Sequence, residues 1–394
     1  MKDLTNLKTF IIDSKDPKEI DDAISIEFLE KSTYIWVHLS YPVKLFKFNS
    51  EIDLEARNKS SSLYLIDNYR PMLPLNIIDE ANLKRNKISE SLSARIELNE
   101  NGSIKNYEIF ETLIRPDFQY TYDDVNELLD LQPIEEYELI HLNKILKKSL
   151  TFRLNNGAII FNTFNPKINI INNNIIFEKN DITEAHNLVS ESMILMSFII
   201  SDFLLKNKIP APFRSQKINC NVEEILEKNK DSLIKYSILK QYIGKSFISI
   251  KHNKHETLGL VSYVQSTAPL RRYIDLIVQR QLYLYFNNLT PLKEDEINIL
   301  IGDYKIRQSE NNNIIKDNKM IYLKKYFNNK ANNLYRIIFI RWINYKRNIA
   351  LVFFPDLWLE TLINLYSSSN TYQNKIYKVQ YNCNEESNLL GFLG

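Results

Sequence analysis

Residues 9–28 read Thr-Phe-Ile-Ile-Asp-Ser-Lys-Asp-Pro-Lys-Glu-Ile-Asp-Asp-Ala-Ile-Ser-Ile-Glu-Phe, and this stretch decides how the rest of the chain is interpreted. It begins with a β-branched and aromatic run, 9–12. It ends with Ile24, Ile26 and Phe28 alternating with polar residues, which is the period of a half-buried strand. The pattern predicts two strands joined by an acidic loop.

The loop carries four acids in the spacing Asp-x5-Glu-x-Asp-Asp: Asp13, Glu19, Asp21 and Asp22. Like charges crowded beside a sheet repel one another, and a divalent cation relieves that repulsion. All the side chains offer hard oxygens, with no Cys or His nearby, which favours Mg²⁺ or Mn²⁺ over Zn²⁺. A solvated acidic loop is the alternative for any acidic run taken alone.

The composition is that of a globular protein. With 394 residues and 44% hydrophobic content, the chain is long enough for one large domain and a small one. Cys220 and Cys383 lie far apart and in no metal-binding pattern, which suits a reducing cytoplasm. Residues 1–8 lack the apolar core of a signal peptide, so we expect a cytoplasmic location. The apolar stretch 193–205 is too short to span a bilayer, so we expect a buried helix, no membrane association and, by default, a monomer.

Charge is unevenly distributed along the chain. The formal net charge is only +2, but residues 303–347 contain eleven Lys or Arg against three Asp or Glu. Such a local excess favours a polyanionic partner and argues against a metal phosphohydrolase of small substrates.

The acidic spacing resembles the signature of the ribonuclease II / ribonuclease R (RNB) family of exoribonucleases, in which all four positions are Asp and hold magnesium. Glu19 is the one departure at these positions. Five further segments resemble the family in the right order: 51–74 with Ser-Leu-Tyr-Leu, 151–163 with Arg-x-x-x-Gly-Ala, the helix containing Ala-His-Asn-Leu-Val-Ser-Glu-Ser-Met, Ile-Pro-Ala-Pro-Phe-Arg at 209–214, and Ser-Thr-Ala-Pro-Leu-Arg-Arg-Tyr-Ile-Asp-Leu at 266–276. The family's His-Ile-Ala-Asp is replaced by His38-Leu39-Ser40-Tyr41.

The resemblance also implies roles for residues of the site. It makes Asp13, Glu19, Asp21 and Asp22 ligands of Mg²⁺, with Mn²⁺ possible. It places Tyr64 on the 3′-terminal base of RNA, although most tyrosines in strands are core residues. It implies that Arg271 contacts the scissile phosphate and that Arg272 and Arg214 also bind the substrate. A late helix, 309–326, brings Asp317 as a weak candidate acid.

Glu19 carries one methylene more than Asp. Because Mg²⁺ requires near-ideal octahedral ligation, this difference predicts better activity with Mn²⁺ than with Mg²⁺.

Pro269 is predicted to occupy the first turn of a helix. Arg271 and Arg272 then lie beside unpaired backbone N–H groups at the positive end of the helix dipole, which makes an anion site. The alternative for Arg271 is an i,i+4 ion pair with Asp275.

Other segments are predicted as structural elements. Asp181 with Glu184 is expected to cap a helix that runs to about Lys206. His186 and Glu191 on that helix are expected to be structural. Residues 221–254 have the pattern of an amphipathic helix.

We therefore expect an α+β protein. Residues 1–330 form the RNB catalytic domain of mixed β-sheet and helices, and 331–394 form a small β-barrel-like domain of the oligonucleotide-binding (OB) type. Basic and aromatic residues suited to RNA interleave along its strands: Arg336, Arg341, Trp342, Tyr345, Lys346 and Arg347.

The resemblance implies a metal-dependent hydrolytic 3′-to-5′ exoribonuclease that degrades single-stranded RNA to nucleoside 5′-monophosphates, with Asp22, Arg271 and Tyr64 as its catalytic residues. The alternative is a catalytically weakened RNA-binding RNB-like protein, which Glu19 and Tyr41 motivate.

Overall fold

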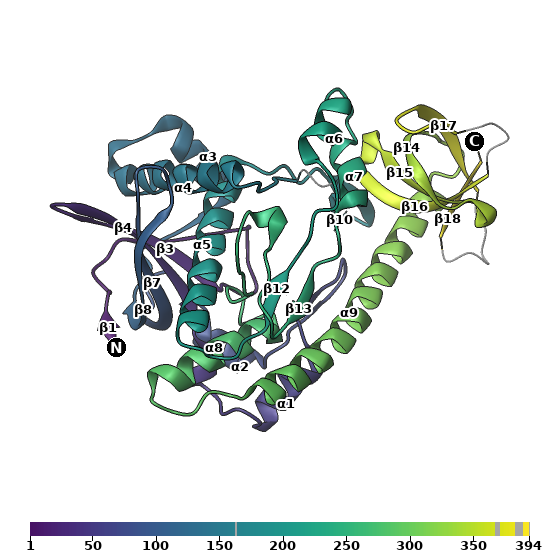
Figure 1. The fold of residues 1–394 in the computed structure, drawn as a ribbon. Helices are drawn as coiled ribbons and strands as arrows, with labels where there is room; N and C mark the ends of the chain where they lie inside the picture. Colours follow the sequence, from purple (N-terminus) through teal and green to yellow (C-terminus); the bar gives the residue numbers. More distant parts are fainter. Residues whose placement is uncertain (162–163, 367–370, 383–388, 394) are drawn as a thin grey trace.

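A computed structural model describes residues 1–161, 164–366, 371–382 and 389–393, so Cys383 lies outside the described residues. The molecule has a large domain built on a twisted sheet, a long helix that leads away from it, and a small barrel at the far end of that helix (Figure 1). The α+β class with a C-terminal barrel is confirmed.

The large domain is organised on a seven-stranded mixed sheet in the order β1-β8-β7-β4-β3-β2-β9. Its strands are β1 Lys2–Asp3, β2 Thr9–Asp13, β3 Asp22–Leu29, β4 Ser32–Ser40, β7 Ser89–Leu98, β8 Ile104–Ile114 and β9 Phe118–Thr121. As predicted, β2 and β3 are neighbouring antiparallel strands. The acidic loop therefore lies at one end of the sheet, with Asp13 closing β2 and Asp22 opening β3.

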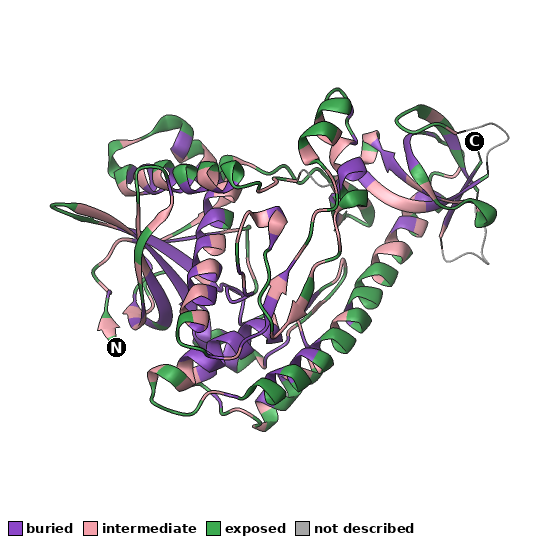
Figure 2. Cartoon of the chain, viewed as in Figure 1, coloured by how far each residue is buried: buried purple, intermediate pink, exposed green. Residues whose placement is uncertain are grey.

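Three helices pack on this sheet: α3 Tyr122–Leu131, α4 Tyr137–Asn155 and α5 Glu184–Lys206. Figure 2 shows α5 and the sheet as largely buried. Within the described chain, α5 alone is long and apolar enough to cross a membrane, and 56% of its apolar window is buried inside the fold. Packing as a core helix therefore accounts for its composition.

The start of α5 differs from the sequence prediction. Asp181 does not cap it; Thr183 is the N-cap, and its side chain and backbone form a capping box with His186. His186 is thus structural, as expected, and the predicted end at Lys206 is confirmed.

Four further helices belong to the large domain, and the last of them leads to the barrel. They are α1 Glu51–Lys59, α2 Leu75–Ala81, α8 Tyr273–Phe286 and the 35-residue α9 Glu294–Asn328, with the short strand pair β5 Leu63–Tyr64 and β6 Tyr69–Arg70 between α1 and α2. Two buried side chains of α8 bond to the end of β4 and the segment after it. Gln279 donates to the Ser40 carbonyl, and Arg280 donates to the carbonyls of Val43 and Phe46.

Residues 221–254 do not form the predicted continuous helix. They contain α6 Val222–Lys228, α7 Lys235–Leu239 and the strand β13 Phe247–Ser249, which pairs with β12 Phe213–Ser215. A two-stranded hairpin, β10 Lys167–Ile171 and β11 Asn174–Glu178, precedes α5.

The C-terminal domain is a closed barrel of β14 Leu334–Asn344, β15 Ile349–Phe354, β16 Leu359–Tyr366, β17 Ile376–Asn382 and β18 Leu390–Leu393. Its hydrophobic core includes two side chains of α9, Leu323 and Phe327. Because the helix contributes to the barrel core, the division at residues 330 and 331 into separately folding domains stays a prediction.

Candidate active site

Asp13 and Asp22 face each other because they stand at adjoining ends of two paired strands. Burial, followed by the negative charges of Asp21 and Asp13, raises the pKa of Asp22 to about 7. Burial also raises the pKa of Asp13. The site therefore concentrates negative charge in a partly desolvated place, which is the arrangement that attracts a cation.

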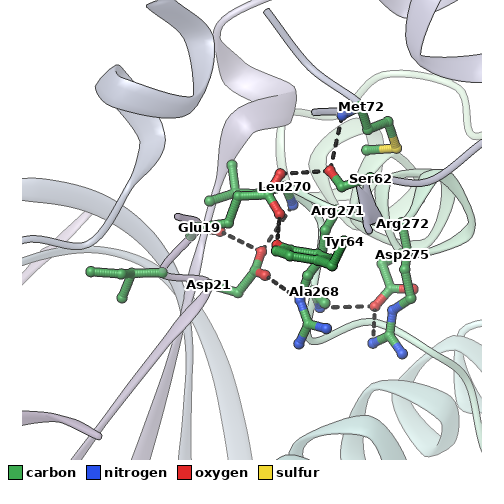
Figure 3. A network of polar contacts seen from close by, with 12 residues as sticks. Glu19, Asp21, Ser62, Tyr64, Met72, Ala268, Leu270, Arg271, Arg272 and Asp275 are labelled. Carbon is green, nitrogen blue, oxygen red and sulfur yellow. Dashed lines mark hydrogen bonds and ion pairs between the residues drawn. The ribbon is translucent and has the colours of Figure 1, made fainter. Parts of the chain in front are cut away.

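Asp21 is buried and engaged by the arginine segment (Figure 3). Its Oδ1 accepts the Leu270 N–H at 2.9 Å, and its Oδ2 accepts the Arg271 Nε–H at 3.0 Å. Burial raises the pKa of Asp21 to about 6, although the charge of Arg271 opposes that rise. Asp21 thus joins the acidic loop to a segment that is remote in the sequence.

Glu19 is also buried, but it points toward a different part of the site. Its carboxylate accepts hydrogen bonds from the Ser62 hydroxyl, at 2.6 Å, and from the Tyr64 hydroxyl. Ser62 in turn accepts the Met72 N–H at 2.9 Å. The extra methylene therefore lets Glu19 reach the loop that carries Tyr64 (Figure 3).

Tyr64 is no ordinary core tyrosine, because 49% of it is exposed. Its ring lies 5.2 Å from that of Tyr69, and its hydroxyl is held by Glu19. Burial of the hydroxyl and the nearby Glu19 raise the pKa of Tyr64 above its usual value, so the phenol stays protonated. An anchored hydroxyl and an open ring face suit the stacking of a base.

The arginine segment differs from its predicted form. α8 starts at Tyr273, so Pro269 and Arg271 precede the helix instead of lying in its first turn. The alternative considered for Arg271, an ion pair with Asp275, is not formed: Asp275 accepts from Arg272, at 2.7 Å, and from the Ala268 N–H. Arg271 uses Nε for Asp21, and 45% of its side chain is exposed. Its Nη groups therefore face solvent at the edge of the acidic loop.

Arg214 and Asp317, two further candidates, make no described hydrogen bond or ion pair with the residues of the acidic loop. Arg214, on β12, donates to Ser246 at 2.8 Å. Asp317 is exposed on α9, whereas its neighbour Asn318 contacts the Tyr64 loop through Ile66. Their proposed roles stay predictions.

Tyr41 stands where the family has Asp, directly after β4. Tyr41 is buried against Tyr283, with its ring 6.4 Å away. The preceding residue supports the loop instead, because the Ser40 N–H donates to the Asp21 carbonyl at 2.7 Å.

Tyr122 is a residue of the site that sequence reasoning missed. Burial and the charges of Asp13 and Asp22 raise its pKa above the usual range, which places its hydroxyl near both acids. Its ring stacks on His186 at 3.9 Å. The sequence marks the start of α3 through the capping box of Thr121 and Asp124, but nothing in it connects that start to the acidic loop.

The carboxylates of the acidic loop can be judged as ligands of a divalent cation by their other contacts. Among the described residues, no group of three or more His, Cys, Asp or Glu side chains forms a ready-made metal site. The described hydrogen bonds to the Asp13 carboxylate both come from Ser14, through its backbone N–H and its hydroxyl, and none of the described hydrogen bonds reaches the Asp22 carboxylate. Mg²⁺ usually keeps several waters and takes one or two protein carboxylates together with substrate phosphates. Asp13 and Asp22 therefore fit Mg²⁺. Glu19 and Asp21 accept hydrogen bonds from protein partners, and their role as metal ligands stays a prediction.

Comparison with known proteins gives a consistent family. The model of the RNB domain matches residues 1–288. An uncharacterized ribonuclease of Synechocystis is 28% identical over 91% of this chain and 54% of its own length. The chloroplastic/mitochondrial ribonuclease II of Arabidopsis thaliana is 30% identical over 71% of this chain and 36% of its own length. The chain thus spans about half or less of the length of these relatives.

Solved structures share the fold. An active-site mutant of the Dss1 exoribonuclease from Candida glabrata superposes with a TM-score of 0.89 at 21% identity, over all of this chain and 55% of that one. Yeast Ssd1, described as a pseudonuclease, superposes with a TM-score of 0.73 at 17% identity, over 92% of this chain and 50% of that one. The fold therefore occurs both with and without nuclease activity.

Proposed function

Because the chain belongs to the RNB domain family, we propose that it is a metal-dependent 3′-to-5′ exoribonuclease that hydrolyses single-stranded RNA to nucleoside 5′-monophosphates. The observation that supports this most is that Arg271 reaches the acidic loop: its guanidinium is bonded to Asp21, and its charge also acts on the nearby carboxylates of Asp13 and Asp22.

Each residue has a defined task in this proposal. Asp13 and Asp22 hold Mg²⁺ or Mn²⁺, which when bound supplies Lewis acidity and an activated water. Arg271, kept in place by Asp21, directs its exposed Nη groups at the phosphate and neutralises charge that develops there. The exposed ring of Tyr64 stacks on the last base.

The barrel supplies a second RNA surface. Tyr345 is 71% exposed, and Trp342 packs against it edge to face at 5.3 Å, which leaves an aromatic platform beside Lys346 and Arg347. Such platforms bind single strands with little regard to sequence. Arg336 is paired with Asp356 and contributes less.

A second candidate function is an RNA-binding protein with a weakened site. Glu19 motivates it, because this acid is committed to Ser62 and Tyr64, and the pseudonuclease relative shows that the fold tolerates such loss.

One comparison separates the two functions. The wild-type protein with Mg²⁺ or Mn²⁺ should release 5′-monophosphates from single-stranded RNA, and EDTA should stop the release. Asp22→Asn should abolish release and keep RNA binding. Asp16→Asn is the matched control, because Asp16 is an exposed acid of the same loop whose positive φ of 56° asparagine tolerates. Wild-type protein that binds RNA but releases nothing would favour the binder.

A further inference from the structure

Lys319 lies on α9 where that helix passes from the large domain to the barrel (Figure 1). Its side chain is half-buried, and its Nζ donates to the Asn165 side-chain oxygen at 2.6 Å. No ion pair to Lys319 occurs among the residues that the structure describes, whereas Arg307 on the same helix pairs with Glu310 at 3.0 Å. The described residues thus offer no carboxylate in an ion pair with this partly buried ammonium.

The neighbours of Lys319 connect two surfaces of the molecule. On one side, Asn318 accepts the Ile66 N–H at 3.0 Å and donates to Asp67 at 2.9 Å, which fastens α9 to the loop after Tyr64. On the other side, the Glu360 N–H of the barrel donates to the Phe164 carbonyl at 2.9 Å, next to Asn165. The ammonium therefore lies between the Tyr64 loop and the barrel.

The charge of Lys319 is incompletely compensated. Burial lowers its pKa, and the charge of Glu360 opposes that change. The Glu360 carboxylate accepts the Ser237 hydroxyl, so it is already engaged. Partial burial of a cation is costly without an anion close to it, and an incoming anion would remove that cost.

We propose that Lys319 is a phosphate-binding residue of the RNA path, and that it contacts a backbone phosphate upstream of the nucleotide whose base stacks on Tyr64. The inference rests on the proposed function, because it takes single-stranded RNA as the ligand. A lysine suits this task, since its compact ammonium binds phosphate as a point charge without selecting a base.

Salt dependence of binding tests the inference. Each phosphate contact to a single strand contributes about 0.7 to the slope of log K against log salt. Binding of a fluorescent single-stranded RNA, in EDTA to prevent cleavage, should give a slope smaller by about this amount in Lys319→Gln, with weaker binding at low salt. Glutamine can still bond to Asn165, so the fold contact remains. Lys319→Arg should restore the slope.

Two controls test whether the change in salt slope is specific to Lys319, one with another lysine variant and one with a short ligand. Lys144→Gln removes an exposed lysine of α4 and should leave the slope unchanged. A dinucleotide has one internal phosphate, which occupies the scissile position assigned to Arg271, so it should bind wild type and Lys319→Gln equally.

An unchanged slope in Lys319→Gln, with a lowered melting temperature, would overturn the inference and make Lys319 a structural tie to Asn165. A wild-type protein that binds no RNA would instead reject the proposed function itself.

Discussion

Arg271 Nε lies 3.0 Å from Asp21 Oδ2, although 250 positions of the chain separate the two residues. Asp21 is almost completely buried, while nearly half of the Arg271 side chain is exposed. The bond to the buried Asp21 therefore orients the Arg271 guanidinium through Nε, and it does not use the Nη donors. A charge-assisted bond of this kind fixes direction as well as charge.

Arg271→Lys should lower kcat by about 100-fold, because lysine keeps the charge but its single nitrogen cannot bond to Asp21 and reach the phosphate through separate groups, as Nε and Nη of arginine can. RNA affinity, measured in EDTA, should change little. Arg115→Lys, at an exposed arginine away from the site, should behave as wild type. Weakened binding with unchanged turnover at saturating RNA would show that Arg271 only holds the substrate.

Tyr64→Ala should lengthen the final product of degradation, because the last base loses a stacking contact worth about 1–3 kcal/mol. Tyr64→Phe keeps the ring and loses the bond to Glu19, so its product length should match wild type. The measurement is the product ladder on a denaturing gel. Tyr137→Ala removes a similarly exposed ring on α4 and serves as control. Identical ladders for all variants would assign Tyr64 a purely structural role.

Glu19→Asp tests what the longer acid does. The shorter side chain cannot reach both Ser62 and Tyr64, and each bond to a carboxylate is worth about 1.5–3 kcal/mol. We expect the rate of monophosphate release to fall about tenfold or more with either metal. Glu19→Gln keeps the length and should retain more activity. If Glu19→Asp were instead faster with Mg²⁺, Glu19 would act as a strained metal ligand, and the sequence-based preference for Mn²⁺ would gain support.

Stability should depend on pH through Asp22. Its folded pKa of about 7 lies above the unfolded value of 3.8, so the folded state binds more protons between these limits. The contribution of Asp22 to stability is therefore present below pH 4 and is lost as pH rises to about 7. Asp22→Asn should gain stability relative to wild type across this window, reaching on the order of 2 kcal/mol at pH 7.5 without divalent metal.

The check is the difference in free energy of unfolding between variant and wild type at each pH, which cancels groups common to both. Mg²⁺ should raise the stability of wild type more than that of the variant, since a ligand stabilises the state that binds it. A difference that stays constant from pH 4 to 8 would contradict the perturbed carboxyl.

The strands around the acidic loop were predictable because their signal is local. Alternation of apolar and polar residues marks β3, and the β-branched run marks β2. The pairing of these neighbours then brings Asp13 and Asp22 together without further information.

Contacts made at long range were not predictable. The sequence offered Asp275, four residues away, as an alternative partner of Arg271. The structure places Arg271 on Asp21 instead, because the segment before α8 folds back on the acidic loop. In the same way, the reach of Glu19 to Tyr64 depends on how two loops pack, and only the packed structure shows it.

The barrel shows the same limit. The apolar and aromatic content of β14, β15 and β17 marks them as strands. The signal is weaker for β16, which interleaves Glu360, Thr361 and Asn364 with its apolar residues, and for β18, which has only four residues. Closure of the barrel through the parallel pairing of β16 with β18 gives no sequence signal.

The shared core of α9 and the barrel has a mechanical consequence. Leu323 and Phe327 are buried among barrel side chains, while Asn318, earlier on the same helix, holds the Tyr64 loop. At about 1.5 Å per residue, the helix places Leu323 roughly 8 Å and Phe327 roughly 14 Å along its axis from Asn318. α9 thus couples the position of the barrel to that of the site. A chain truncated before the barrel would expose Leu323 and Phe327 to solvent, which would favour aggregation.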